Sequence, residues 1–203
     1  MKALYVTDRA SVGDARLAEI LDALGGASGL SVVLREPPAD DRDLLERARD
    51  ARARLGDAVP LFVHRRFDVA LAAGAAGVHL PSSGLPVSRV RVHTPRSFRV
   101  GVSTHSAVEA ERAIADGADV VVIGPVFDTP SKRRYGPPLG PAALAGLPPQ
   151  DSHGAEVYAI GGVDEDTLPA LAPYADRIAG IAAIRLFQES PEPRVVAERL
   201  AAR

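Results

Sequence analysis

The chain has 203 residues, enough for one domain with a sizeable core, and its net charge of −2 does not indicate a nucleic-acid-binding surface. It contains no cysteine, which excludes disulfides, thiolate metal sites and cysteine nucleophiles. No apolar run approaches the roughly 20 residues of a membrane span, and residues 1–8 turn polar too soon for a signal peptide. We therefore expect a cytoplasmic protein that binds neither nucleic acid nor membranes.

Short apolar runs rich in Val and Ile alternate with longer stretches rich in Ala, Leu and Arg. The runs cover residues 3–7, 30–35, 60–64, 77–80, 99–103, 120–124, 157–161 and 178–183. Helical patterns cover residues 40–55, 68–73, 106–117, 164–171 and 193–202, while residues 85–95 predict a single turn or no helix. Ser106 and Glu109 form a capping-box pattern at one helix start. Apolar strands separated by helices indicate a parallel sheet covered by helices.

Eight such units fit either a closed barrel or an open doubly wound sheet. The first strand–helix turn lacks the Gly-x-Gly-x-x-Gly pattern of dinucleotide-binding sheets, which favours the barrel. We predict a single (β/α)8 TIM-barrel domain over residues 1–203. Its loops must be short, because this fold more often needs about 250 residues.

In a barrel of this kind, ligands bind where the strands end. Gly161 and Gly162 follow the seventh predicted strand, and the eighth is followed by Ile184 and Arg185. Paired glycines before a helix allow backbone N–H groups to approach a phosphate. We predict a phosphate site here, although the same glycines could simply form a tight turn.

Three further features lie at strand ends. The loop of residues 124–140 carries hydroxyls and consecutive cations, which suits either a lid over an anion or an ordinary solvated loop. Arg35 could grip a second phosphate or form a rim salt bridge with Glu36.

His64, His79 and His105 fall near successive strand ends and could hold zinc. No carboxylate accompanies them, however, and His79 is better explained as a core residue.

The order of these motifs resembles the thiamin phosphate synthase and thiazole tautomerase (TenI-like) family. The resemblance rests on segments spread over nearly the whole chain: residues 5–8, 34–36, 68–71, 77–80, 101–105, 124–132, 138–140 and 159–162. The synthase joins a pyrimidine diphosphate to a thiazole phosphate and releases pyrophosphate. The resemblance implies a phosphorylated thiazole substrate, and it leaves a homodimer open.

The resemblance also assigns roles to individual residues. It implies that the thiazole phosphate is held by Thr129, Ser131, Gly161, Gly162 and the backbone near Ile184, with Gly140 and Arg185 also lining the substrate site. It implies that Arg35, Ser103 and Lys132 face the pyrophosphate or the pyrimidine, and that Ser103 and Lys132 take part in catalysis.

The departures from the family pattern concern the diphosphate half of the site. Pro37 replaces a lysine, and Arg185 replaces a serine. The two aspartates that would hold Mg²⁺ are replaced by Arg65 and Gly84. We therefore predict no metal site and no cofactor, with Mg²⁺ needed only if the chain is a synthase. The tautomerase branch has its own departure, because Pro125 stands where that branch has an acid/base histidine.

Three functions remain open. The first, which the sequence favours, is a tautomerase or divergent relative that acts on a thiazole phosphate, with His64 as the acid/base group. The second is a synthase whose diphosphate site is rebuilt from Arg65, Arg66 and Arg185. The third is a non-catalytic phosphate-binding or regulatory barrel. His64 could also be a space-filling residue at the rim.

Overall fold

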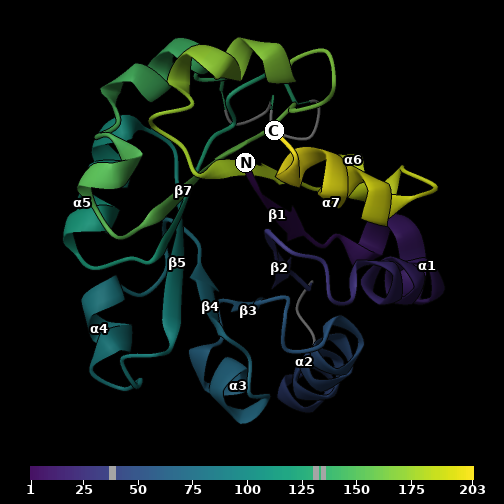
Figure 1. The fold of residues 1–203 in the computed structure, drawn as a ribbon. Helices are drawn as coiled ribbons and strands as arrows, with labels where there is room; N and C mark the ends of the chain where they lie inside the picture. The colour runs from purple at the N-terminus through teal and green to yellow at the C-terminus, as the bar shows by residue number, and fades with distance from the viewer. Residues whose placement is uncertain (37–39, 130–132, 134–135) are drawn as a thin grey trace. The chain divides into compact units, whose positions relative to one another are not determined.

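The strands of the computed structural model, which describes residues 1–36, 40–129, 133 and 136–203, form a closed parallel barrel in chain order (Figure 1). They are β1 (Lys2–Val6), β2 (Leu30–Leu34), β3 (Leu61–His64), β4 (Gly77–Leu80), β5 (Arg99–Thr104), β6 (Val120–Ile123), β7 (Glu156–Ile160) and β8 (Gly180–Ala183). All eight predicted strands are present within about two residues at each end. The TIM-barrel prediction is therefore confirmed.

Helices follow most strands, although two predictions about them need correction. They are α1 (Arg9–Leu24), α2 (Asp41–Leu55), α3 (Phe67–Ala72), α4 (Val87–Arg91), α5 (Ala107–Ala115), α6 (Arg185–Gln188) and α7 (Pro193–Ala201). The structure also has the 3-10 segments η2 (Pro141–Gly146), η3 (Gln150–Ser152) and η4 (Leu168–Tyr174). The helix expected over residues 164–171 is wrong: the structure has η4 instead, because Pro169 and Pro173 cannot donate the backbone bonds of an α-helix. The sequence pattern also missed α1, which Gly13 interrupts with a φ of 80°.

The chain divides into two compact units, which are described separately below. The first contains residues 1–79 and 183–203, and therefore β1 to β3, α1 to α3, α6 and α7. The second contains residues 80–182, and therefore β5 to β7 and α4, α5 and η2 to η4.

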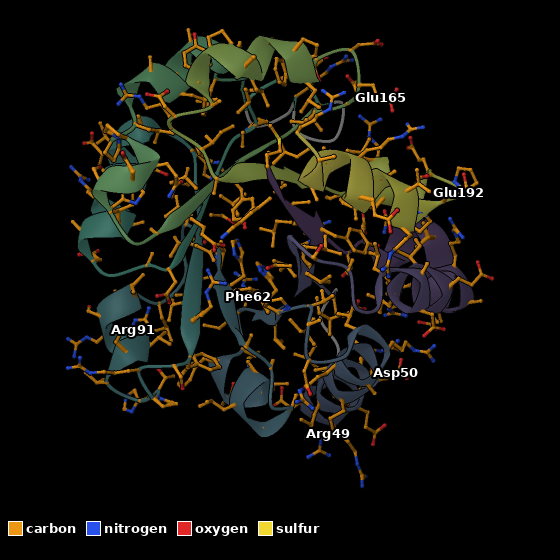
Figure 2. The ribbon with its side chains drawn as sticks, in the orientation of Figure 1. Arg49, Asp50, Phe62, Arg91, Glu165 and Glu192 are labelled. Carbon is orange, nitrogen blue, oxygen red and sulfur yellow. The ribbon has the colours of Figure 1, made fainter. Side chains whose placement is uncertain are left out.

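The strands are almost fully buried, as expected for a parallel barrel with helices outside it. In the first unit, Val33 lies opposite Phe62 in the β2–β3 register, and both are at most 1% exposed. Figure 2 shows Phe62 among the strands, whereas Arg49 on α2 points outward. In the second unit, Tyr158 on β7 lies opposite Val122 on β6 and is 1% exposed. Apolar packing on both faces of the strands explains why their sequences are continuous rather than alternating.

Charged side chains join α1 to α2 on the outside of the first unit. Arg47 of α2 binds Asp14 of α1 at 2.8 Å and Asp43 of its own helix at 2.9 Å. Arg54, seven residues on, repeats the arrangement with Asp22 of α1 and Asp50 of α2, both at 2.8 Å. Each pair is partly exposed, so solvent screening keeps the stabilisation that each one alone contributes small.

Buried contacts fix α6 against β1 in the first unit. Tyr5 of β1 packs on Phe187 of α6 with ring centroids 5.2 Å apart, and its hydroxyl accepts a hydrogen bond from Gln188 at 3.2 Å. Burial raises the pKa of the Tyr5 hydroxyl to about 12. This packing holds Arg185, the first residue of α6, directly after the end of β8.

None of the helices in the described part of the chain is long and apolar enough to cross a membrane.

Candidate functional site

The glycine turn after β7 is built so that its backbone can approach a ligand. Gly161 and Gly162 have φ angles of 99° and 64°, which side chains rarely adopt. Among the residues that the structure describes, none accepts a hydrogen bond from the backbone N–H of Gly162 or Val163. Two adjacent amide donors at a strand end suit a phosphate. The sequence analysis did not predict Val163 as a phosphate-binding residue, because the pattern of this turn identifies only the two glycines.

The chain after β6 packs directly on this turn. The amide of Phe127 donates to the Gly161 carbonyl at 2.9 Å. A Cβ added to Gly161 would lie 2.6 Å from the Pro125 Cβ, and one added to Gly162 would lie 2.6 Å from the Asp128 carbonyl oxygen. The glycines are therefore required by close packing as well as by their backbone angles. Both explanations offered by the sequence, a tight turn and a ligand-binding turn, describe the same geometry.

The loop of residues 124–140 returns to the end of β6. Gly140, with a φ of 74°, donates its amide to the Val126 carbonyl at 2.9 Å. Thr129 is half-buried, and its hydroxyl donates to the Phe127 carbonyl at 3.1 Å. Arg133 pairs with Asp128 and is thus not a free cation of the loop. Ser131 and Lys132 lie outside the described residues, as do most of the cations expected to act in a lid.

His105 follows β5 and is oriented more firmly than the sequence suggested. Its ring Nδ1 lies 2.7 Å from the Gly124 carbonyl oxygen, which can only accept, so Nδ1 carries a proton and donates it to this bond. The backbone amide of His105 donates to Glu109 at 2.7 Å. Ser103, two residues earlier on β5, is half-buried opposite Val122 of β6. The spacing of Ser106 and Glu109 was the available signal for this ordered strand end.

In the first unit, Arg35 lies at the end of β2. Its backbone amide donates to the Thr7 hydroxyl at 2.9 Å, and its guanidinium lies 3.5 Å from the Asp8 carboxylate. Glu36 does not pair with Arg35: Arg9 donates to its Oε2 at 2.5 Å, and its side chain is 1% exposed. The rim salt bridge expected of Glu36 thus exists with a different arginine, and Arg35 keeps a half-buried guanidinium at the strand end.

His64 and His79 form a stacked pair at the ends of β3 and β4. They lie opposite each other in the register, with ring centroids 6.2 Å apart. His79 is 5% exposed, which confirms it as a core residue. Burial, followed by the charges of Arg65 and Arg35, lowers the pKa of His64 to about 4. Burial, followed by the charge of His64, lowers the pKa of His79 to about 3.

The consecutive arginines after His64 have different environments. Arg66 donates to Asp68 at 2.9 Å and is paired with Asp41, and these hydrogen bonds raise the pKa of its guanidinium. Arg65 is exposed and has a φ of 69°. Arg66 is thus already paired with Asp41 of α2 and Asp68 of α3, whereas its part in a rebuilt diphosphate site stays a prediction.

The end of β8 presents Ile184 and Arg185. Ile184 is half-buried and precedes α6, while Arg185 is exposed at its first position. Across residues 1–36, 40–129, 133 and 136–203, no three His, Asp or Glu side chains form a group that could hold a metal ion.

The comparisons with known proteins agree with this geometry. The sequence profile of the family described as "Thiamine monophosphate synthase" matches residues 3–186. The chain belongs to this family. A protein named "Putative thiamine-phosphate synthase" from Geobacter sulfurreducens is 40% identical over 200 residues, which cover 97% of this chain and 91% of that protein. A "Thiamine-phosphate synthase" from Methanoculleus marisnigri is 40% identical over 89% of this chain and 86% of its own.

The thiamine monophosphate synthase family is also represented among solved structures. The "Thiamine phosphate pyrophosphorylase" from Pyrococcus furiosus superimposes with a TM-score of 0.79 at 26% identity, over 99% of this chain and 94% of that one. A "3-Hexulose-6-Phosphate Synthase" structure has a TM-score of 0.64 at 18% identity, which supports the fold alone.

The Mg²⁺ that the resemblance implies for a synthase does not fit the residues at the ends of β3 and β4. The positions that would supply carboxylates hold Arg65 and Gly84, and neither side chain offers an oxygen to a hard cation. Arg65 would also repel the ion.

Proposed function

We propose that the chain is a thiamine-phosphate synthase, which joins a pyrimidine diphosphate to a thiazole phosphate and releases pyrophosphate. The observation that carries the proposal is the extent of the match: relatives with this name are 40% identical over about nine-tenths of the chain or more. The sequence alone favoured the tautomerase. The names of the relatives support the synthase instead, so we place the synthase first.

The glycine turn after β7 is the binding site proposed for the thiazole phosphate. The amides of Gly162 and Val163 donate to its oxygens, and the half-buried hydroxyl of Thr129 lies on the segment that packs against this turn. Fixed backbone donors lose no side-chain entropy when the phosphate binds. The turn therefore positions the thiazole while the reacting end of the molecule stays free.

The diphosphate is assigned to the cations that follow β2 and β3. Arg35 is fixed through its backbone to Thr7, and its half-buried guanidinium, whose ion pair with Asp8 is long at 3.5 Å, donates to a phosphate oxygen. A cation at this place stabilises the negative charge that collects on the departing pyrophosphate.

A second candidate is proton transfer on a thiazole phosphate by His64. The favourable observation is that the Nδ1 atom of His64 is buried and has no hydrogen-bond partner in the described part of the chain. Its pKa of about 4 is unfavourable, because a general base works best with a pKa near the operating pH. We rank this function second.

The deciding experiment is incubation of the protein with both substrates, with and without Mg²⁺, followed by chromatography. We expect thiamin phosphate and pyrophosphate, and we expect Gly162→Asp to abolish their formation. Isomerised thiazole phosphate without thiamin phosphate would favour the second candidate. Binding of thiazole phosphate without either product would leave a non-catalytic phosphate-binding barrel.

A further inference from the structure

Arg65 holds a backbone conformation that its side chain disfavours. Among the described residues it is the only one other than glycine with a left-handed φ, at 69°. The surrounding backbone enforces this geometry, since the Arg65 amide donates to the His79 carbonyl and the Arg66 amide donates to the His64 carbonyl, both at 2.9 Å. Glycine would adopt the same turn at lower cost. A strained arginine at a strand end therefore suggests that its side chain has a role.

The guanidinium of Arg65 is available, and the adjacent arginine shows the contrast. Arg66 binds two carboxylates, Asp41 and Asp68. Arg65 is exposed, and its guanidinium has no hydrogen bond or ion pair within residues 1–36, 40–129, 133 and 136–203. Many other arginines of the first unit, including Arg47 and Arg54 on α2, are paired with acids. The guanidinium of Arg65 thus forms no ion pair that would stabilise the fold, in contrast to those of Arg66, Arg47 and Arg54.

Arg35 adds a second cation beside the same strand end. The β2–β3 register pairs Leu34 with Val63, which sets Arg35 next to His64 and one residue from Arg65. The only described acid within ion-pair distance of Arg35 is Asp8, at 3.5 Å. The two cations, together with burial, keep the imidazole of His64 neutral. This strand end therefore has a local excess of positive charge.

We propose that Arg65 and Arg35 bind a diphosphate group directly, without a divalent cation between the protein and the phosphates. Two planar guanidinium forks match the oxygens of a diphosphate and neutralise part of its charge, which is what a metal ion does in other diphosphate sites. The identity of the diphosphate as a pyrimidine ester rests on the proposed function. Binding of a diphosphate without metal does not.

The test is calorimetric titration of the whole protein with inorganic pyrophosphate, in EDTA and in millimolar Mg²⁺. We expect binding in EDTA that Mg²⁺ does not strengthen. Arg65→Gln should weaken it by about tenfold or more, because it removes a charge-assisted hydrogen-bonding group. Arg66→Gln is the matched control, since the adjacent arginine has the same charge but is already paired, and its affinity should stay within about twofold.

Arg65→Gly separates binding from folding. Glycine relieves the left-handed strain, so this variant should be at least as stable as the parent in urea unfolding and still lose pyrophosphate affinity. Pyrophosphate binding that requires Mg²⁺ would overturn the proposal, as would equal affinities for Arg65→Gln and the parent protein. Pyrophosphate binding as expected with no thiamin phosphate formed would instead reject the synthase activity and leave this proposal intact.

Discussion

Mild acid should destabilise the protein through the pair of His64 and His79. The folded state keeps both imidazoles neutral, with pKa values of about 4 and about 3, whereas an unfolded histidine has a pKa near 6.5. Above pH 6.5 neither state takes up a proton, and these residues have no effect. Below pH 6.5 these two imidazoles bind protons in the unfolded chain but stay neutral in the folded chain, so the free energy of unfolding falls as the pH falls.

The size of the effect follows from the two shifts. Each group changes the free energy of unfolding by about 1.4 kcal/mol per pH unit between its unfolded and folded pKa. From pH 6.5, where the unfolded imidazoles are half protonated, to pH 5.0 both groups contribute, so the fold should lose about 3 kcal/mol. That loss is a large part of the roughly 5 to 15 kcal/mol by which domains are usually stable. The carboxylates with lowered pKa values, such as Asp41 and Asp68, change the free energy of unfolding only below about pH 4. They therefore do not contribute between pH 6.5 and pH 5.0.

Urea unfolding at pH 7.5, 6.5, 5.5 and 5.0 measures the effect. His64→Asn and His79→Gln should each remove about half of the pH dependence, although either can lower stability at all pH values by disturbing the packing. A free energy of unfolding that is the same at pH 6.5 and pH 5.0 in the parent protein would refute the reasoning.

Three further predictions concern single residues of the second unit. Gly162→Ala should weaken binding of a thiazole phosphate more than tenfold in calorimetry and lower Tm, because its Cβ would lie 2.6 Å from the Asp128 carbonyl oxygen; unchanged affinity would argue against the phosphate turn. Ser106→Ala should cost about 1 kcal/mol in urea unfolding, because the serine side chain caps α5, whereas Ser106→Asp should cost little. Asp119→Ala should destabilise by about 1 to 3 kcal/mol, since it leaves the Val100 amide without the acceptor that it now has at 2.6 Å; a change below 0.5 kcal/mol would contradict this.

The barrel was predictable because the signals for it are local. Each strand is a short apolar run that stays buried on both faces, and turns of small or polar residues separate it from the next helix. The helix after β7 was wrongly predicted, since its helical spacing of apolar residues concealed the effect of two prolines, Pro169 and Pro173. The helix α1 was missed for the opposite reason: Gly13 breaks its pattern and interrupts the helix itself with a φ of 80°, while residues on either side stay helical and α1 packs against α2 and α7.

The site was predictable where a residue type fixes its own role. Gly161 and Gly162 could be assigned because a left-handed turn at a strand end requires glycine. The different roles of Arg65 and Arg66 could not be predicted from two adjacent arginines in the sequence, because these roles depend on which carboxylates the fold places nearby. The neutral state of His64 depends in the same way on burial and on two cations from different strands.

The ion pairs between α1 and α2 have a consequence for how these helices align. Arg47 and Arg54 are seven residues apart on α2, and their partners Asp14 and Asp22 are eight apart on α1, so the two contacts sit two turns from each other. A slide of α2 along α1 by a single turn would break both contacts at once and leave Arg47 and Arg54 paired only with Asp43 and Asp50 of their own helix. Individually weak pairs can therefore act together to fix the axial register of one helix against the other more sharply than smooth apolar packing would.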